Sequence, residues 1–309
     1  MNLMHLKYAV EVAETGSINK AAEKLYIGQP NLSRAIKELE ATLGIAVFER
    51  CPKGMIPTAE GETFLKYAKT ILKQVDEVEG MFKNGNIQKK RFSLSAPRAS
   101  YVADAFARFS NALINESDVE VLYKETNSSR TLKNVQQDDY KLGIIRYAED
   151  YDMHYKNLLD DKDFEYEVIT TFSYELLVSE ESELAKKENI SFGDLHDYIE
   201  IAHADPFVPS LSSAQVKKYE LSDDIRKRIF VFERASQFEI LSQNPDTFMW
   251  VSHIPESLLK RYGLIQKKCK ENTKIYKDVL IRKKGYKLTE LDSLFITELC
   301  KAKRENFNA

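Results

Sequence analysis

The chain has 309 residues, 43% of them hydrophobic and 30% charged, which is enough for two domains with real cores. Its three cysteines (Cys51, Cys269 and Cys300) form no CxxC pair, and no apolar run approaches the roughly 20 residues of a membrane span, so composition excludes a disulfide framework, a zinc site and a membrane anchor. The first residues show no signal-peptide pattern, and we expect a cytoplasmic protein. A net charge of −3 argues against nucleic-acid binding unless local charge placement decides otherwise.

Three short helices are predicted in the first 44 residues. Gly16 ends the first, and Ser17 stands where the cap of the second belongs. Gly28 marks a tight turn, Pro30 suits the first turn of the third helix, and Gly44 ends that helix. Apolar residues recur at helical spacing and predict one common core: Leu3, Leu6, Val10, Ala13, Ile18, Ala21, Ala22, Leu25, Leu32, Ala35, Ile36, Leu39 and Leu43.

Burial of that stripe leaves a polar cluster at the start of the third helix. Gln29, Asn31, Ser33 and Arg34 carry the groups that pair with base edges and phosphates. From Leu25 to Ala35 the only charge is that of Arg34, so no carboxylate would repel phosphate. A lone polar cluster fits an ordinary solvated helix start equally well. Its place in a complete helix-turn-helix favours recognition of a major groove.

A hairpin is predicted next. Two short apolar runs, Ile45 to Arg50 and Met55 to Pro57, flank the turn Cys51 to Gly54. Behind a helix-turn-helix such a hairpin is a wing, and we expect Arg50 and Lys53 to face phosphate or the minor groove. The alternative is a solvated turn.

A long helix from Thr58 to Lys83 follows, and it would span roughly 40 Å. Its apolar residues alternate spacings of four and three, which is a heptad seam: Phe64, Ala68, Ile71, Val75, Val78 and Phe82. A second copy of the chain is the simplest partner for this seam, and a core helix of the next domain is the alternative. The polar stretch from Asn84 to Lys90 predicts a hinge.

The remaining two-thirds alternate strand and helix, which predicts parallel α/β sheets in two lobes with a cleft between them. The helices are expected at Val102 to Leu113, Ser128 to Gln137 and Leu291 to Leu299. The strands are expected at Arg91 to Ser95, Val119 to Tyr123, Leu142 to Ile145, Glu175 to Val178, Tyr198 to Ala202, Arg228 to Phe232, Thr247 to Val251 and Val279 to Ile281.

The whole chain resembles the LysR-type transcriptional regulators. The segments that carry the resemblance are Gly16 to Ala22, Gln29 to Glu40, Leu43-Gly44, Phe48-Glu49-Arg50 and Thr58 to Gly61, with weaker matches downstream at Lys141 to Arg146, Ser191 to Leu195 and Ile254 to Ser257. Gly28 departs from the family, which often has Ser or Thr there, and this should weaken the cap of the third helix.

The resemblance implies an α+β multidomain protein. A winged helix-turn-helix DNA-binding domain would span residues 1–60, a dimerising linker helix and hinge 61–90, and a two-lobed effector domain like a type 2 periplasmic binding protein 91–309. It implies a homodimer or homotetramer on an inverted repeat in promoter DNA, with no membrane. The DNA contacts it implies are Asn19, Lys20, Gln29, Pro30, Asn31, Ser33, Arg34, Arg50 and Lys53.

An effector cleft is also implied, lined by Arg98, Ser100, Thr126, Ser128, Arg146, His203 and Trp250. Arg98 and Arg146 suggest a small anionic effector, unless each arginine pairs with a nearby carboxylate. A lone histidine such as His203 is more often a satisfied histidine at a strand end than a ligand contact, and a residue such as Trp250 is more often part of a core than of a cleft. An enzyme carrying a DNA-binding module is the alternative function, but the chain has no GxSxG, HExxH, P-loop or GxGxxG motif. A solute-binding protein lacks support without a signal peptide. We expect no cofactor or metal.

Overall fold

The computed structural model describes residues 2–51, 54–83, 89–137, 139–203, 205–209, 211–221 and 225–307. It divides into two compact units, Met1–Gln88 and Lys89–Ala309, and each is described by itself. Among the described helices, none is long and apolar enough to cross a bilayer.

The first unit begins with the expected three helices, α1 (Leu3–Thr15), α2 (Ile18–Lys24) and α3 (Gln29–Leu43). Gly16 and Gly44 end α1 and α3 in the left-handed conformation, as predicted. Ser17 caps α2 by accepting the amide of Lys20. The predicted shared core is confirmed for Ile18, Ala21, Ala22, Leu32, Ile36 and Leu39, which are all buried in one cluster. The prediction is wrong for Leu3, the first residue of α1, which is exposed.

The hairpin and the long helix complete this unit. Strands β1 (Phe48–Cys51) and β2 (Gly54–Pro57) pair antiparallel, and α4 (Ala59–Lys83) follows. Thr58 caps α4 by accepting the amide of Gly61 at 2.9 Å. Any residue larger than glycine is sterically excluded at position 61, because its Cβ would lie 2.0 Å from the Val47 carbonyl oxygen. Glu40 of α3 accepts the amides of Val47 and Phe48, so α3, the hairpin and the start of α4 form one body.

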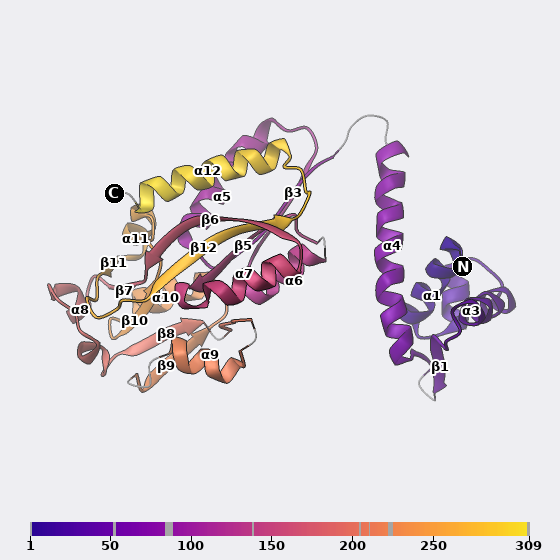
Figure 1. The fold of residues 1–309 in the computed structure, drawn as a ribbon, viewed down its shortest axis with the longest axis horizontal. Helices are drawn as coiled ribbons and strands as arrows, with labels where there is room; N and C mark the ends of the chain where they lie inside the picture. Colours follow the sequence, from indigo (N-terminus) through magenta and orange to yellow (C-terminus); the bar gives the residue numbers. More distant parts are fainter. Residues whose placement is uncertain are drawn as a thin grey trace. The chain divides into compact units, whose positions relative to one another are not determined.

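The second unit has two lobes, each with a five-stranded mixed sheet covered by helices on both faces (Figure 1). In the first lobe the strand order is β4-β3-β5-β12-β6. Its strands are β3 (Lys90–Ala96), β4 (Val119–Glu125), β5 (Leu142–Ala148), β6 (Phe164–Ser173) and β12 (Ile275–Lys283), and its helices are α5 (Ser100–Ala112), α6 (Ser128–Gln136), α7 (Asp152–Asp161) and α12 (Glu290–Phe307).

Strand alternation builds the two faces of that sheet. Leu280 points to the core under α5 and α12, whereas its neighbours Val279 and Ile281 point to the core under α6 and α7. A short 3-10 helix follows α5 at Leu113–Asn115, and another follows β5 at Glu149–Tyr151.

The second lobe has the strand order β11-β7-β10-β8-β9. Its strands are β7 (Glu175–Ser179), β8 (Ile199–His203), β9 (Lys227–Val231), β10 (Thr247–Val251) and β11 (Leu264–Lys267), and its helical segments are α8 (Glu183–Lys186), the 3-10 turn Phe192–Leu195, α9 (Ser213–Glu220), α10 (Arg234–Gln243) and α11 (Glu256–Tyr262).

The expected parallel pairing is confirmed for β3 with β4 and β5 and for β8 with β9 and β10, but it is wrong for β7 and β12. Strand β12 runs antiparallel to both β5 and β6, and β7 runs antiparallel to both β10 and β11. The reason is the path of the chain, which leaves the first lobe through β6 and returns to it through β12. Strands β6 and β11 were not predicted, and β6 alternates buried and exposed residues only weakly.

Candidate DNA-binding face and effector cavity

The start of α3 presents an exposed polar surface, which we call the α3 tip: Gln29, Asn31, Ser33 and Arg34. Three of these residues are exposed and Ser33 is half-buried. Gly28 at the N-cap supplies no side-chain acceptor, as its departure from the family pattern predicted. Within the described part of the chain, no tip side chain has a hydrogen bond or an ion pair to another protein group. Their donors and acceptors are therefore available to a partner molecule.

The other predicted DNA contacts are placed less completely. Asn19 and Lys20 are exposed on α2, and Pro30 is exposed in the first turn of α3. Arg50 belongs to β1, but its side chain lies outside the described residues, as does Lys53 altogether.

The predicted seam of α4 divides into two parts. Ala68 is 1% exposed, and Leu65 beside it is buried in the core that α1 shares. Phe64 packs against the same core, so this part is used within the chain. Farther along, Ile71 and Val78 are exposed and Val75 is half-buried, whereas the side chain of Phe82 lies outside the described residues.

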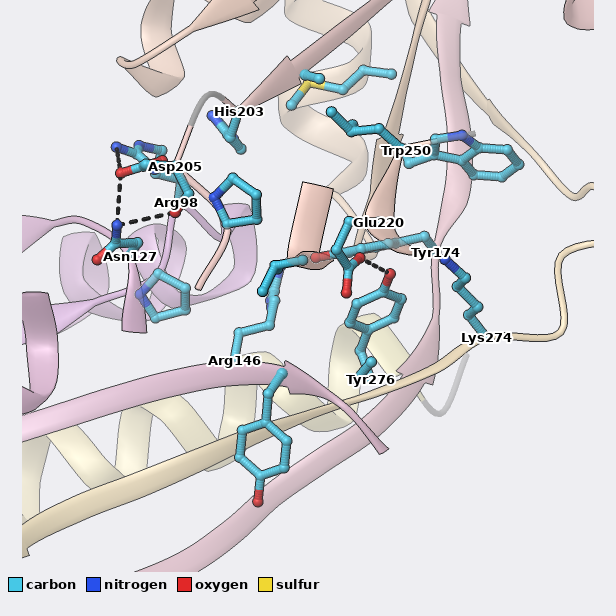
Figure 2. A pocket seen from close by; sticks show the side chains of 18 of the residues that line it. Arg98, Asn127, Arg146, Tyr174, His203, Asp205, Glu220, Trp250, Lys274 and Tyr276 are labelled. Atoms are coloured by element: carbon cyan, nitrogen blue, oxygen red, sulfur yellow. Dashed lines mark hydrogen bonds and ion pairs between the residues drawn. The ribbon is translucent and has the colours of Figure 1, made fainter. Parts of the chain in front are cut away.

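A cavity of about 520 Å³ lies between the two lobes of the second unit. Six of the predicted effector residues line it: Arg98, Thr126, Ser128, Arg146, His203 and Trp250. Ser100 instead lines a neighbouring cavity of about 30 Å³, together with Gln237. Aromatic residues make up much of the larger wall, among them Tyr147, Tyr174, Phe192 and Tyr276. Figure 2 shows two of these tyrosines, Tyr174 and Tyr276, close to Glu220.

Arg98 holds a carboxylate from the opposite lobe. Its guanidinium donates to both oxygens of Asp205, at 3.0 and 3.3 Å, and Asn127 Nδ2 donates to one of them at 3.0 Å (Figure 2). Arg98 follows β3 in the first lobe, and Asp205 follows β8 in the second. The contact therefore joins the lobes across the cavity, as does the ion pair between Arg234 and Glu125 at 2.8 Å.

Arg146 is also paired, but within the first lobe. It donates two bonds of 2.7 Å to Asp278, which is fully buried, and it stacks on the ring of Phe172. The hydroxyl of Tyr101 donates to the same carboxylate at 2.6 Å, and burial raises the pKa of this tyrosine. For both arginines the structure has the pairing that the sequence analysis gave as the alternative to ligand binding.

Ser128 and His203 have partners inside the protein. Ser128 Oγ donates to the Arg146 carbonyl at 2.7 Å and accepts the Arg146 amide at 3.0 Å, which fixes the start of α6 to the end of β5. His203 Nδ1 donates to the Val231 carbonyl at 3.3 Å. Burial, with Arg98 nearby, lowers the pKa of His203 to about 4, so its ring is neutral at pH 7.

Two more carboxyl groups line the cavity, that of Glu200, which is buried, and that of Glu220, which is half-buried. Glu200 pairs with Arg228 at 2.6 Å. Glu220 accepts the Tyr276 hydroxyl at 2.7 Å, as Figure 2 shows. Burial raises the pKa of both carboxyl groups. The shift is opposed by Arg228 at Glu200, by the Tyr276 hydroxyl at Glu220, and less by the charge of Lys274 at both. The cavity therefore has one position where Arg98 binds a carboxylate and another where the carboxyl groups of Glu200 and Glu220 line the wall.

Residues 3–62 match the family model described as the bacterial regulatory helix-turn-helix protein, lysR family. The HTH-type transcriptional regulator BenM of Acinetobacter baylyi is 47% identical over 83 residues, which are 27% of each chain. The chain thus spans only about a quarter of the length of BenM. An uncharacterized HTH-type regulator of Escherichia coli, YnfL, is 26% identical over 63% of each chain. The N-terminal 60 residues are thus similar to the helix-turn-helix domain of the LysR family of bacterial regulators.

The solved structures agree with the LysR-type fold over the full length. The crystal structure of full-length CbnR complexed with its target DNA covers 98% of this chain and 100% of its own, with a TM-score of 0.62 and 16% identity. At that identity the likeness concerns the fold alone.

The partners of Arg98 and Arg146 were not predicted from the sequence. Asp205 lies just beyond the carboxyl end of a predicted strand. Ligand sites in α/β proteins form at such strand ends, so this position was a signal for a cavity residue. Asp278 adjoins the apolar run Val279 to Ile281, and a charge at the edge of a buried strand is a signal for an ion pair. Glu220 gave no signal, because it ends a surface helix with several other charges.

Proposed function

We propose that the chain is a DNA-binding transcriptional regulator whose promoter binding responds to a small-molecule effector in the cavity between the lobes. The observation that carries the DNA-binding half is the α3 tip, which is mostly exposed and makes no side-chain bond to any described residue, in a complete helix-turn-helix that matches the LysR-family model. A protein that acts on promoter DNA belongs in the cytoplasm, so the proposal includes that location.

The proposed binding unit is a homodimer or homotetramer on an inverted repeat. Recognition helices read two half-sites when a two-fold axis of the protein matches that of the DNA. The exposed part of the α4 seam, Ile71 to Val78, supplies the apolar surface for the partner copy. CbnR, the structural relative, was crystallised with its target DNA, which supports the DNA partner by similarity.

We expect Arg34→Ala to weaken operator binding by about 1–3 kcal/mol if Arg34 pairs with a base edge. The operator comes from a genome-wide footprint of bound DNA, and fluorescence anisotropy measures the affinity of the purified duplex. Arg34→Lys is the matched control, since lysine keeps the charge but lacks the two-pronged donor. Unchanged affinity of Arg34→Ala would remove Arg34 from the interface.

For the effector we propose a small anion that competes with Asp205. Arg98 and Asn127 already hold a carboxylate in a geometry that a ligand acid can match. A ligand that took this place would release a contact between the lobes. Such a change in lobe closure would shift the packing of the oligomer and alter DNA binding.

We expect the Asp205→Asn variant to bind carboxylate ligands about tenfold more tightly than the natural chain. The reason is that the side chain at position 205 then carries no negative charge to compete with the ligand for Arg98. Isothermal titration calorimetry with a panel of aliphatic and aromatic acids, each beside its uncharged amide, measures the effect. Glu183→Gln, an exposed acid on α8, is the control and should leave the affinities unchanged.

Tight binding of only neutral or cationic compounds would contradict the anionic effector. It would direct attention to the part of the cavity where Glu220 and the tyrosine rings suit an amine. An enzyme with a DNA-binding appendage finds no support among the named relatives, which are regulators.

A further inference from the structure

The turn between α2 and α3 contains a tyrosine in an unusual backbone conformation. Tyr26 has a φ of 54°, in the left-handed region that side chains with a Cβ avoid. Its amide donates to the Glu23 carbonyl at 3.1 Å, and the Ile27 amide donates to the Ala22 carbonyl at 3.0 Å. These two bonds form the helix-ending motif that ordinarily has glycine at this position.

Elsewhere the same chain uses glycine for this purpose. Helices α1, α3 and α11 end at Gly16, Gly44 and Gly263, whose φ angles are 62°, 71° and 61°. Among the described residues, the other non-glycine with a positive φ is Asp163, at 52° after α7. Aspartate enters this region more readily than an aromatic residue, so Tyr26 is the more strained of the two.

Packing does not compensate for the strain at Tyr26. Its side chain is 95% exposed, and it makes no hydrogen bond within the described part of the chain. The folded unit therefore gains nothing from the ring or the hydroxyl. Strain that the surrounding structure maintains without such a gain is a mark of a functional position.

We infer that the Tyr26 hydroxyl donates a hydrogen bond to a phosphate oxygen of the DNA strand beside the groove that the α3 tip enters. The inference rests on the proposed function. Tyr26 lies three residues before Gln29, on the segment that leads directly into the tip. Tyrosine is among the residues that contact the DNA backbone and fix the register of a recognition helix without reading sequence.

The chemistry of the neighbouring residues favours a neutral donor at this point. Lys24 ends α2, but its ammonium is paired with Glu11 at 2.8 Å. Between Leu25 and Arg34 no other charged side chain is present. A phosphate beside this turn would therefore be met by hydroxyl, amide and backbone donors.

Four versions of the full chain test the inference: the natural chain, Tyr26→Phe, Tyr26→Gly and Asp163→Gly. The probe is a fluorescein-labelled duplex of mixed sequence, about three helical turns long, because a phosphate contact does not depend on base sequence. Fluorescence anisotropy gives the affinity at several salt concentrations, and thermal melting gives the stability.

Tyr26→Phe and Tyr26→Gly should each weaken binding about tenfold, the value of one hydrogen bond to a charged oxygen. The slope of log affinity against log salt should stay unchanged, since no cation is lost. Tyr26→Gly should also raise the melting temperature, so stability and affinity move in opposite directions. Asp163→Gly should raise the melting temperature without changing affinity.

Natural affinity in both Tyr26 variants would overturn the inference, and the exposed ring would then be a candidate contact for a protein partner. If Arg34→Ala weakens operator binding while the Tyr26 variants bind the duplex like the natural chain, only the role of Tyr26 fails. If the natural chain binds neither this duplex nor any footprinted operator, the proposed function fails together with the inference.

Discussion

Replacing Asp278 with alanine is expected to lower the free energy of unfolding of the second unit by about 3–5 kcal/mol. The reason is the charge that remains. Arg146 is only 12% exposed, and its two bonds of 2.7 Å to Asp278 are what offset the cost of burying its guanidinium. Tyr101 would lose its acceptor in the same step. Urea unfolding followed by circular dichroism measures the change.

Two further variants make this test specific. Glu183→Ala removes an exposed acid with a lysine partner and should change stability by less than about 0.5 kcal/mol. Asp278→Ala combined with Arg146→Met removes both charges and should recover part of the loss, because no unpaired ion stays in the core. A loss below about 1 kcal/mol in Asp278→Ala alone would mean that the pair contributes little.

Aspartate at both Ile71 and Val75 is expected to convert the proposed oligomer into monomers. Burial of one isoleucine or valine side chain contributes about 1.5–3 kcal/mol, and a two-fold seam buries two pairs of them. Loss of even half of that would raise the dissociation constant more than about a hundredfold. Sedimentation equilibrium measures the mass of the particle. Half-site binding by a monomer should also lower the affinity for an inverted repeat, because the effective concentration of the second site is lost.

Lys66→Asp is the matched control for the seam. It places the same carboxylate on α4, with the same helix propensity, but on a face turned away from Ile71 and Val75. The control should sediment like the natural chain. Intact dimers in the double aspartate variant would show that α4 is not the contact between copies.

The first unit was predictable in detail because its signals are local. Cap residues, turn glycines and the stripe from Ile18 to Leu39 lie within a few helical turns of one another, and the structure places them as expected. The seam was predicted in part, since periodicity does not tell which apolar residues the neighbouring α1 covers. Ala68 is the example, because it fits the heptad yet packs within the chain.

The cavity shows where sequence reasoning stops. Layout placed six of seven predicted lining residues correctly, because strand ends meet at one edge of a sheet. The ion-pair partners of the two arginines could not be predicted, because Asp205 lies 107 positions from Arg98 and Asp278 lies 132 positions from Arg146. No periodicity links residues so far apart. The antiparallel return through β12 decides the second pairing, and that return was not predicted.

The rigid attachment of α4 to α3 affects the distance between the two DNA half-sites that a pair of copies can bind. Glu40, Thr58 and Gly61 join its first turn to the hairpin and to α3, so helix and tip turn together. In a pair of copies joined through the exposed seam, the 25 residues of α4 would form a lever of about 37 Å. A change of about ten degrees in the crossing angle would move the lever's end by about 6 Å, close to two base-pair steps of about 3.4 Å. Small rotations far from the duplex would thus set which half-site separation the protein accepts.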